Sequence, residues 1–131
     1  TLSRSKFKKI KKGEKINLET PLKKGQDISG HICQGHVDTT ATLIKKFKKD
    51  KAYVLEFKIH GNFQKFLVNK ASILINGVSL TISKIVGNKF SIWIIPHTSK
   101  LTNMADLKLK DIVNIEIDIL SKYVKKFLNE K

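Results

Sequence analysis

The stretch ILINGVSLTISKI, from Ile73 to Ile85, decides the fold. Apolar residues alternate with hydroxyl-bearing ones in its second half, which is the period of a strand with one covered face. Asn76-Gly77 interrupts the run, and both residue types tolerate positive φ angles, so the chain turns there. We therefore predict two strands with a tight turn between them.

Similar runs recur along the rest of the chain: Thr39 to Ile44, Tyr53 to Ile59, Phe90 to Ile95, and Ile112 to Ile119. Gly61-Asn62 and Gly87-Asn88 provide further turns, and Pro96 closes one strand. This pattern favours an all-β barrel or sandwich. Residues 63–68 have apolar residues at helical spacing, so we expect a short helix across one end of the barrel.

The carboxy end predicts a helix with one apolar stripe. Ser121 is the expected cap, and Tyr123, Val124, Phe127 and Leu128 lie on one side of the helix, opposite lysines. This stripe packs either on the core or on another subunit.

Length and composition indicate one core, because the chain has 131 residues of which 40% are hydrophobic. Cys33 is the only cysteine, so an internal disulfide is excluded and a reducing, cytoplasmic location is expected. No apolar run is long enough to cross a bilayer, and no signal peptide is evident, so we expect no membrane partner. The missing initiating methionine suggests a piece of a longer polypeptide.

The net charge of +15 invites a nucleic-acid function, but Arg4 is the only arginine among 26 basic residues. Lysines cluster at 6–15, at 45–51 and near the carboxy end, where turns and solvated faces are expected. Trp93 and the phenylalanines do not group with basic residues on one predicted strand face. We therefore expect no nucleic-acid partner, and a basic barrel that binds single-stranded nucleic acid stays an alternative.

The two ends of the chain resemble each other at a shift of about 97 residues. The shift places Phe7 on Met104, and it also matches the pairs Thr1 and Thr98, Ile10 and Leu107, Lys11 and Lys108, Ile16 and Val113, Asn17 and Asn114, and Glu19 and Glu116. The start therefore resembles the end of a domain, as in a duplicated architecture.

Three stretches carry candidate chemistry: Gly30 to Asp38, Ile75 to Thr81, and Ile94 to Thr98. The two histidines of the first lack residues that would complete a metal site, so we expect no metal. We expect His31 to be an ordinary core histidine. Ser79 and Thr81 point to one side of their strand, and we expect these hydroxyls to line a cavity at the barrel mouth.

The order of the motifs resembles the second half of a riboflavin synthase α chain. The motifs are Asn-Leu-Glu, Gly-His-Ile-x-x-Gly-His-Val-Asp, a lysine, Asn-Gly-Val-Ser-Leu-Thr, Ile-Pro-His-Thr, and Val-Asn-Ile-Glu-Ile-Asp, and they cover residues 1–119. The resemblance implies a six-stranded Greek-key barrel with short helices. It assigns residues 1–19 to the end of a preceding lumazine-binding barrel, 20–119 to one such barrel and 120–131 to a carboxy-terminal helix.

The resemblance also implies the reaction: two molecules of 6,7-dimethyl-8-ribityllumazine dismutate to riboflavin and 5-amino-6-ribitylaminouracil, without metal or redox cofactor. It implies a homotrimer for the full-length enzyme and association with lumazine synthase. His36 is the candidate general base, with Ser79 and Asp118 as further catalytic candidates. The residues expected to contact substrate are Gly35, His36, Val37, Lys70, Ser79, Leu80, Thr81, Ile94, Ile95, Pro96, His97 and Thr98.

Apart from its end at residues 1–19, the first barrel of such enzymes is missing, because its opening Phe-Thr-Gly motif and its ligand loop have no counterpart in residues 1–131. Because a productive site in this family resembles a sandwich of two barrels, we expect this chain to bind a lumazine but to turn it over poorly unless two copies pair. A non-catalytic lumazine- or flavin-binding module is the alternative within the same fold.

Overall fold

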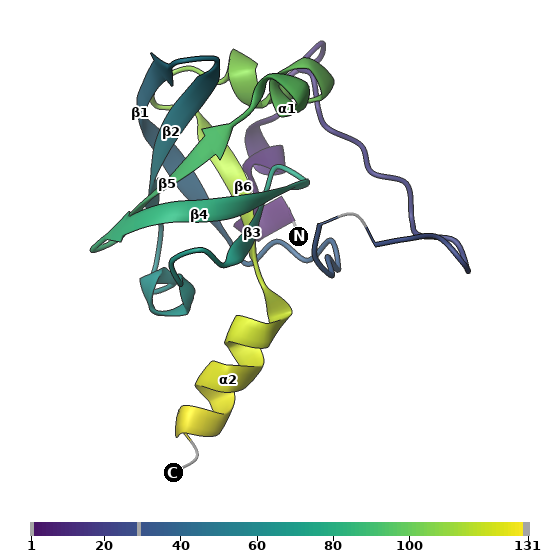
Figure 1. Ribbon diagram of the computed structural model, residues 1–131, viewed down its shortest axis with the longest axis vertical. Helices are drawn as coiled ribbons and strands as arrows, with labels where there is room; N and C mark the ends of the chain where they lie inside the picture. Colours follow the sequence, from purple (N-terminus) through teal and green to yellow (C-terminus); the bar gives the residue numbers. More distant parts are fainter. Residues whose placement is uncertain (1, 29, 130–131) are drawn as a thin grey trace.

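The computed structural model describes residues 2–28 and 30–129 (Figure 1). Thr1 and residues 130–131, which the predictions for the two ends include, lie outside the described residues. The sheet strands are β1 (Thr39–Lys49), β2 (Ala52–Ile59), β3 (Ser72–Ile75), β4 (Val78–Val86), β5 (Lys89–Ile94) and β6 (Ile112–Ile117). The helical elements are η1 (Leu2–Arg4), η2 (Lys6–Lys9), η3 (Gln64–Phe66), α1 (Pro96–Leu101), η4 (Asn103–Asp106) and α2 (Ile119–Asn129).

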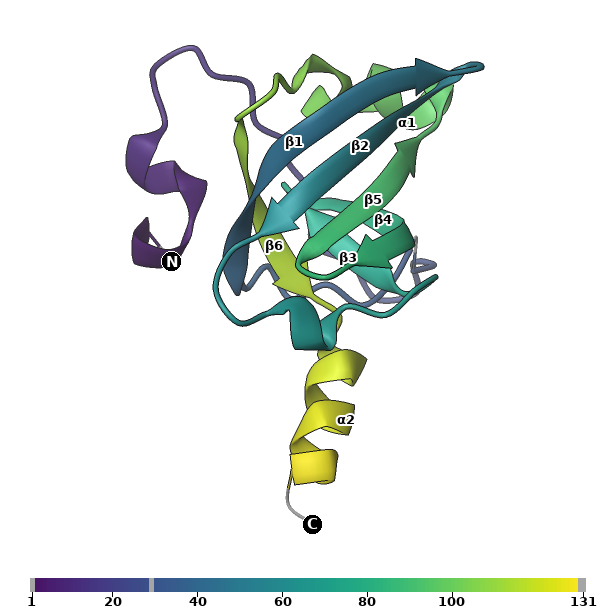
Figure 2. The same cartoon turned by 90° about the vertical axis from the view of Figure 1, so that its left-hand side faces the viewer.

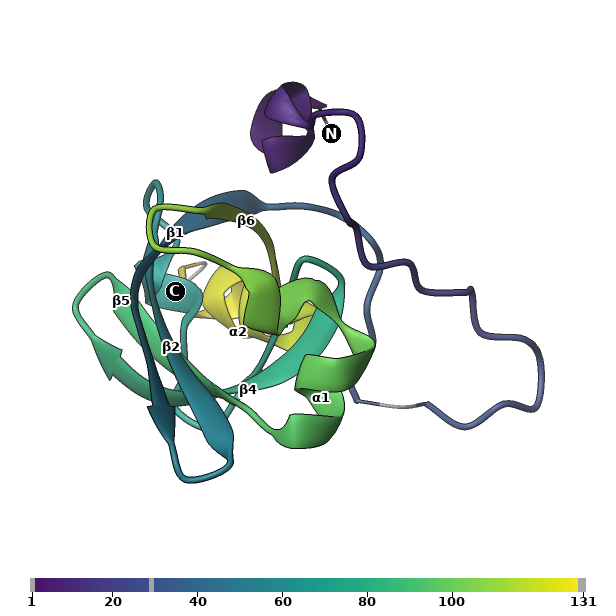
Figure 3. The same ribbon diagram turned by 90° about the horizontal axis from the view of Figure 1, so that it is seen from above.

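The six strands form a closed antiparallel barrel in the order β1-β2-β5-β4-β3-β6, so the all-β prediction is confirmed. The view from above shows the ring of strands, with α1 and η4 over one end (Figure 3). The turn at Asn76-Gly77 joins β3 to β4, and both residues have positive φ. Inward-facing aliphatic and aromatic side chains fill the barrel, and the rings of Phe57 and Phe90 stack at 5.6 Å.

Several boundaries differ from the prediction. β1 runs five residues beyond Ile44, where the prediction ended it. The prediction was too short because the lysines of residues 45–49 occupy both faces of the strand and hide its period. The expected helix at 63–68 is only the single turn η3, although it does lie at one end of the barrel, beside α2 (Figure 2). The helix α1 was not predicted.

Ser121 is not the cap of α2. The helix begins at Ile119, and Asp118 caps it, because its Oδ1 accepts the Leu120 N–H at 3.0 Å. Figures 1 and 2 show α2 leaving the barrel from the end opposite α1. Lys122 pairs with Asp38 at 2.7 Å and ties the first turn of the helix to the barrel. No helix among the described residues is long and apolar enough to span a membrane.

The apolar stripe of α2 faces solvent in this single chain. The exposed fractions of its side chains lie between 56% for Tyr123 and 65% for Phe127 and Leu128. The alternative in which the stripe packs on the barrel's own core is therefore wrong, because the helix projects away from the barrel rather than folding back on it (Figure 1).

The expectation that no aromatic residues group with basic ones on a strand face is also wrong. Phe47 pairs with Val54, and Val54 pairs with Trp93, so the three lie in one row across β1, β2 and β5. Directly paired residues point to the same face of a sheet. Sequence reasoning missed this row because the register between strands is not visible in any one strand.

The first segment of the chain has the same local structure as a segment 97 residues later. The turns η2 and η4 start at Lys6 and Asn103. A side-chain hydroxyl caps each turn by accepting a hydrogen bond from the backbone N–H two residues later. Ser5 Oγ accepts from the Phe7 N–H and Thr102 Oγ1 accepts from the Met104 N–H, both at 3.3 Å.

The loops that follow also correspond. Glu14 accepts the Lys11 N–H through Oε2 at 3.3 Å, and Asp111 accepts the Lys108 N–H through Oδ2 at 2.8 Å. The backbone bonds in the opposite direction, from Glu14 to Lys11 and from Asp111 to Lys108, occur in both loops.

The two segments contact each other reciprocally. The Lys6 N–H donates to Asn114 Oδ1 at 2.7 Å, and the Asn103 N–H donates to Asn17 Oδ1 at 2.9 Å. Lys6 and Asn103 are 97 positions apart in the sequence, and so are Asn17 and Asn114. The same hydrogen bond is therefore made twice, once in each direction, as a local two-fold relation requires.

Candidate ligand-binding site

The candidate site lies on the outer surface of β6, β3 and β4, not inside the barrel. Ser79 pairs with Leu74, and Leu74 pairs with Glu116, so these three side chains share one outward-facing row. Leu80 and Ile82, between and beyond the hydroxyls, are buried in the core. Ser79 and Thr81 share a side as predicted, but that side faces out of the barrel, because the barrel interior is filled with the apolar side chains of the core.

The loop of residues 30–37 crosses this row, and Glu116 holds its second half. The carboxylate of Glu116 accepts the Gln34 N–H at 2.7 Å and the His36 N–H at 2.8 Å. Glu116 is only 6% exposed, so both bonds are shielded from water. Gly35 between them has a φ of +75°, which a residue with a Cβ adopts only under strain.

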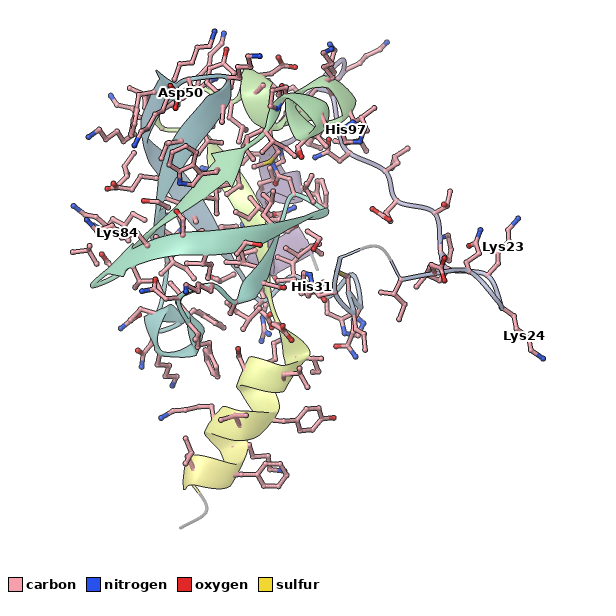
Figure 4. All side chains as sticks on the ribbon, viewed as in Figure 1. Lys23, Lys24, His31, Asp50, Lys84 and His97 are labelled. Atoms are coloured by element: carbon pink, nitrogen blue, oxygen red, sulfur yellow. The ribbon has the colours of Figure 1, made fainter. Side chains whose placement is uncertain are left out.

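His31 holds the first half of the loop. Its Nδ1 shares a hydrogen bond of 2.7 Å with Ser79 Oγ. His31 is half-buried and lies on the barrel surface at the foot of the loop (Figure 4), so it is not a core histidine. The prediction for His31 was wrong, because its partner Ser79 lies 48 residues away in the sequence and only the docked loop brings the two together.

Gly30 is required for this close approach. A Cβ built on Gly30 would lie 2.6 Å from Ser79 Oγ, well inside van der Waals contact, and the φ of Gly30 is +90°. The flanking glycines therefore let the loop lie directly against β4.

Cys33 belongs to the same cluster and stays protonated. Its Sγ donates to the His31 carbonyl oxygen at 3.2 Å and lies 3.7 Å from His31 Nε2. Burial raises the pKa of the Cys33 thiol above its ordinary value, and the nearby carboxylates of Glu116, Glu19 and Asp118 raise it further. The thiol is therefore a neutral hydrogen-bonding group rather than a nucleophilic thiolate at neutral pH.

A groove of about 750 Å³ opens beside Ser79. Its walls are residues 16–19 of the first segment, residues 77–79 at the start of β4, and residues 99–103 of α1 and the turn after it. Asn17 fixes one wall to another, because its amide donates to the Asn103 Oδ1 and to the Asn76 carbonyl oxygen, both at 2.9 Å.

The other predicted contact residues fall into two groups. The side chains of Leu80 and Ile94 lie in the core, so only their backbone groups face outward. The remaining residues are exposed or partly exposed around the loop, β4 and α1, and these are Gly35, His36, Val37, Lys70, Thr81, Ile95, Pro96, His97 and Thr98. His97 lies on α1, on the same side of the molecule as His31 (Figure 4).

Sequence reasoning missed Glu116 as a part of the site and missed the groove walls at 16–19 and 99–103. The signal for Glu116 was its place in β6, where apolar neighbours on both sides leave a carboxylate pointing outward. Among the described residues, no group of three or more histidine, cysteine or acidic side chains is arranged to hold a metal ion.

A closed six-stranded antiparallel barrel with a helix at each end places the chain in the class of small β-barrel domains. The sequence profile of the Lumazine binding domain matches residues 34–118, and the chain belongs to this family. The matched residues include the second half of the loop from Gln34 on, Glu116 and all six strands of the barrel, whereas Gly30 and His31 precede the match.

The chain is also similar in sequence to riboflavin synthases from several bacteria. A riboflavin synthase from Photobacterium phosphoreum is 38% identical over 128 residues, which are 98% of this chain and 59% of that protein. A riboflavin synthase from Bacillus subtilis is 35% identical over 99% of this chain and 60% of its own length. This chain therefore spans about three fifths of the length of these relatives.

The fold matches a solved structure described as LumP complexed with riboflavin. The two chains superpose with a TM-score of 0.82 at 24% identity, over 88% of this chain and 63% of the other. At this identity the match supports the fold of the barrel and nothing finer.

Proposed function

We propose that this chain supplies one substrate site of a riboflavin synthase, which converts two molecules of 6,7-dimethyl-8-ribityllumazine into riboflavin and 5-amino-6-ribitylaminouracil. The observation that carries the proposal is the Ser79 hydroxyl, held by His31 beside a loop that Glu116 anchors. The relatives are named riboflavin synthases, and a solved structure of the same fold is described as LumP complexed with 6,7-dimethyl-8-(1'-D-ribityl) lumazine. The atoms of two lumazines equal those of the two products, so the reaction needs no oxidant or reductant.

The outer face of β4 offers what a flat heterocycle with a polyhydroxyl tail requires. The hydroxyls of Ser79 and Thr81 and the loop around Gly35 supply polar groups for the ring edge and the ribityl chain. Val37 and the first turn of α1, with Ile95, Pro96, His97 and Thr98, are proposed to contact the ring from two sides. Lys70, in the turn just before β3, is proposed to reach the ligand from the rim.

The chemistry calls for a base that removes a proton from an acidic methyl group of one lumazine. His36 suits this role, because its imidazole is exposed and its backbone is fixed by Glu116, so the side chain projects from a rigid point. Ser79 is proposed to hydrogen-bond the substrate while His31 sets the direction of its hydroxyl. Asp118 is a further catalytic candidate, although its Oδ1 also caps α2.

We further propose that residues 1–19 are the end of a preceding barrel of the same kind. The matching caps and loops of the segments at 5–14 and 102–111 support a duplication. The reciprocal bonds of Asn17 and Asn114 support two barrels related by a local two-fold axis. We also propose that the full-length enzyme is a homotrimer, and the exposed apolar stripe of α2 supports contact between copies of the chain.

The test is a titration with 6,7-dimethyl-8-ribityllumazine followed by a turnover assay. We expect Ser79→Ala and Thr81→Ala to weaken binding by about tenfold each, because each removes one hydrogen bond to the ligand. Ser83→Ala is the matched control, since Ser83 lies on the same strand but bonds to the Ser91 carbonyl oxygen. Equal loss in all three variants would contradict the site.

Turnover per chain should rise with protein concentration, because two barrels have to meet to bring two lumazines together. Riboflavin fluorescence at several protein concentrations measures this rate. A rate per chain that does not depend on concentration would count against pairing of copies. Binding without turnover at every concentration would instead assign the chain to the non-catalytic lumazine-binding modules.

A further inference from the structure

The row of Phe47, Val54 and Trp93 lies on the far side of the barrel from the candidate site and has no part in the proposed function. Phe47 is 41% exposed and Trp93 is 42% exposed, while Val54 between them is nearly covered at 7%. The two rings therefore lie along the sheet on either side of Val54. Because neighbouring strands are about 4.8 Å apart, the rings are separated by about 10 Å.

Lysines alternate with the aromatic ring on β1. Lys45 and Lys49 are two residues from Phe47 on either side, so all three point outward from the barrel. Lys45 Nζ lies 5.1 Å from the ring centre of Phe47, and Lys49 Nζ lies 5.4 Å from that of Trp93. A lysine ammonium group therefore already lies over each of the two rings.

The same face carries further positive charge. The exposed Lys58, Lys84 and Lys89 lie in the neighbouring outward-facing rows of paired residues on β2, β4 and β5. Glu56, which pairs with Lys45, is the one acidic residue in these rows. Figure 4 shows Lys84 and the hairpin tip at Asp50 on one side of the molecule and His31 on the other. This combination of Phe47, Val54, Trp93 and the flanking lysines is named the aromatic-lysine face.

We propose that the aromatic-lysine face binds single-stranded nucleic acid without sequence preference. Bases stack on exposed rings whatever their identity, and lysines neutralise the phosphates that run beside them. Lysine lacks the planar fork that reads base edges in pairs, which is why no sequence preference is expected. Duplex DNA would bind more weakly, because its bases are not free to stack.

An anionic membrane is the other surface that lysines and aromatics attract. The geometry favours nucleic acid, because more than half of the Phe47 and Trp93 side chains is covered, and a lysine lies over each ring. A side chain that inserts into a bilayer has to project from the surface, whereas a stacking platform is flat.

The experiment measures binding of a fluorescein-labelled oligothymidylate of about 12 nucleotides by anisotropy. If three lysines contact phosphates, a fourfold rise in salt weakens binding by about twentyfold. Phe47→Ala should weaken binding by about fivefold or more and leave the salt dependence unchanged. The double variant Lys45→Ala/Lys49→Ala should weaken binding and also reduce the salt dependence.

Lys23→Ala/Lys24→Ala is the matched control, because it removes the same charge from a loop on the opposite side of the molecule (Figure 4). The proposal is overturned if this control weakens binding as much as Lys45→Ala/Lys49→Ala does. It is also overturned if Phe47→Ala binds as well as the parent chain, or if the chain binds phosphatidylglycerol vesicles but not the oligonucleotide. Lumazine binding by the same variants should be unchanged, which separates this inference from the proposed function.

Discussion

At the scale of single residues, Gly30 allows the loop of residues 30–37 to lie in close contact with β4. In the same loop, burial and nearby carboxylates raise the pKa of the Cys33 thiol. Neither depends on the rest of the loop sequence, so each is testable with one substitution.

Gly30→Ala should undock the loop from β4. The new Cβ would meet Ser79 Oγ at 2.6 Å, and the positive φ adds strain of about 1 kcal/mol. We expect faster hydrogen exchange at the Gln34 and His36 amides and weaker lumazine binding. Gly25→Ala is the control, because it has a similar φ of +83° and open space around its Cβ. Similar exchange in the two variants would show that the contact with Ser79 is unimportant.

Cys33 should react slowly with iodoacetamide near neutral pH. Its raised pKa means that the reactive thiolate appears only at a pH above the ordinary range for cysteine. Glu19→Gln removes one of the carboxylates that raise the pKa, so the midpoint of the rate against pH should move down. A midpoint at or below that of a free cysteine would contradict the interpretation.

At the scale of elements, Asp118 caps the first turn of α2. Asp118 accepts the Leu120 N–H through its side chain and the Ser121 N–H through its carbonyl oxygen. The same residue is a catalytic candidate, so capping and catalysis have to be separated by experiment.

Asp118→Ala and Asp118→Asn separate these roles. Alanine removes the cap, which costs about 1 kcal/mol and speeds exchange of the Leu120 amide about fivefold, whereas asparagine caps nearly as well as aspartate. If the carboxylate acts in catalysis, turnover falls in both variants. If it only caps the helix, turnover in Asp118→Asn equals that of the parent chain.

At the scale of the whole molecule, the exposed apolar stripe of α2 predicts contact between copies of the chain. We expect Phe127→Ala to shift the chain toward the monomer, because this side chain is 65% exposed in the single chain and would be buried between copies. Sedimentation equilibrium measures the shift. Lys125→Ala, on the other side of the helix, should leave the association unchanged, and an equal shift in both variants would rule out the stripe as the contact.

The local pattern of residues determined much of this fold. Alternation and turn pairs located every strand of the barrel, since both depend on neighbours a few residues apart. The same reasoning failed for residues 45–49, where lysines occupy both faces of β1. It also failed at α1, where Pro96 ends a strand and begins a helix within one turn.

The sequence alone determined that the chain is a β-barrel with a glycine-flanked histidine loop and hydroxyls on one side of a strand. Only the tertiary structure decided that those hydroxyls face outward, that His31 and Glu116 hold the loop, and that Phe47 and Trp93 share a row. The reason is that strand alternation shows which residues share a side but not which side is covered. Contacts such as that of His31 with Ser79 depend on strand register and on a loop docked across it, and both arise only when distant parts of the chain meet.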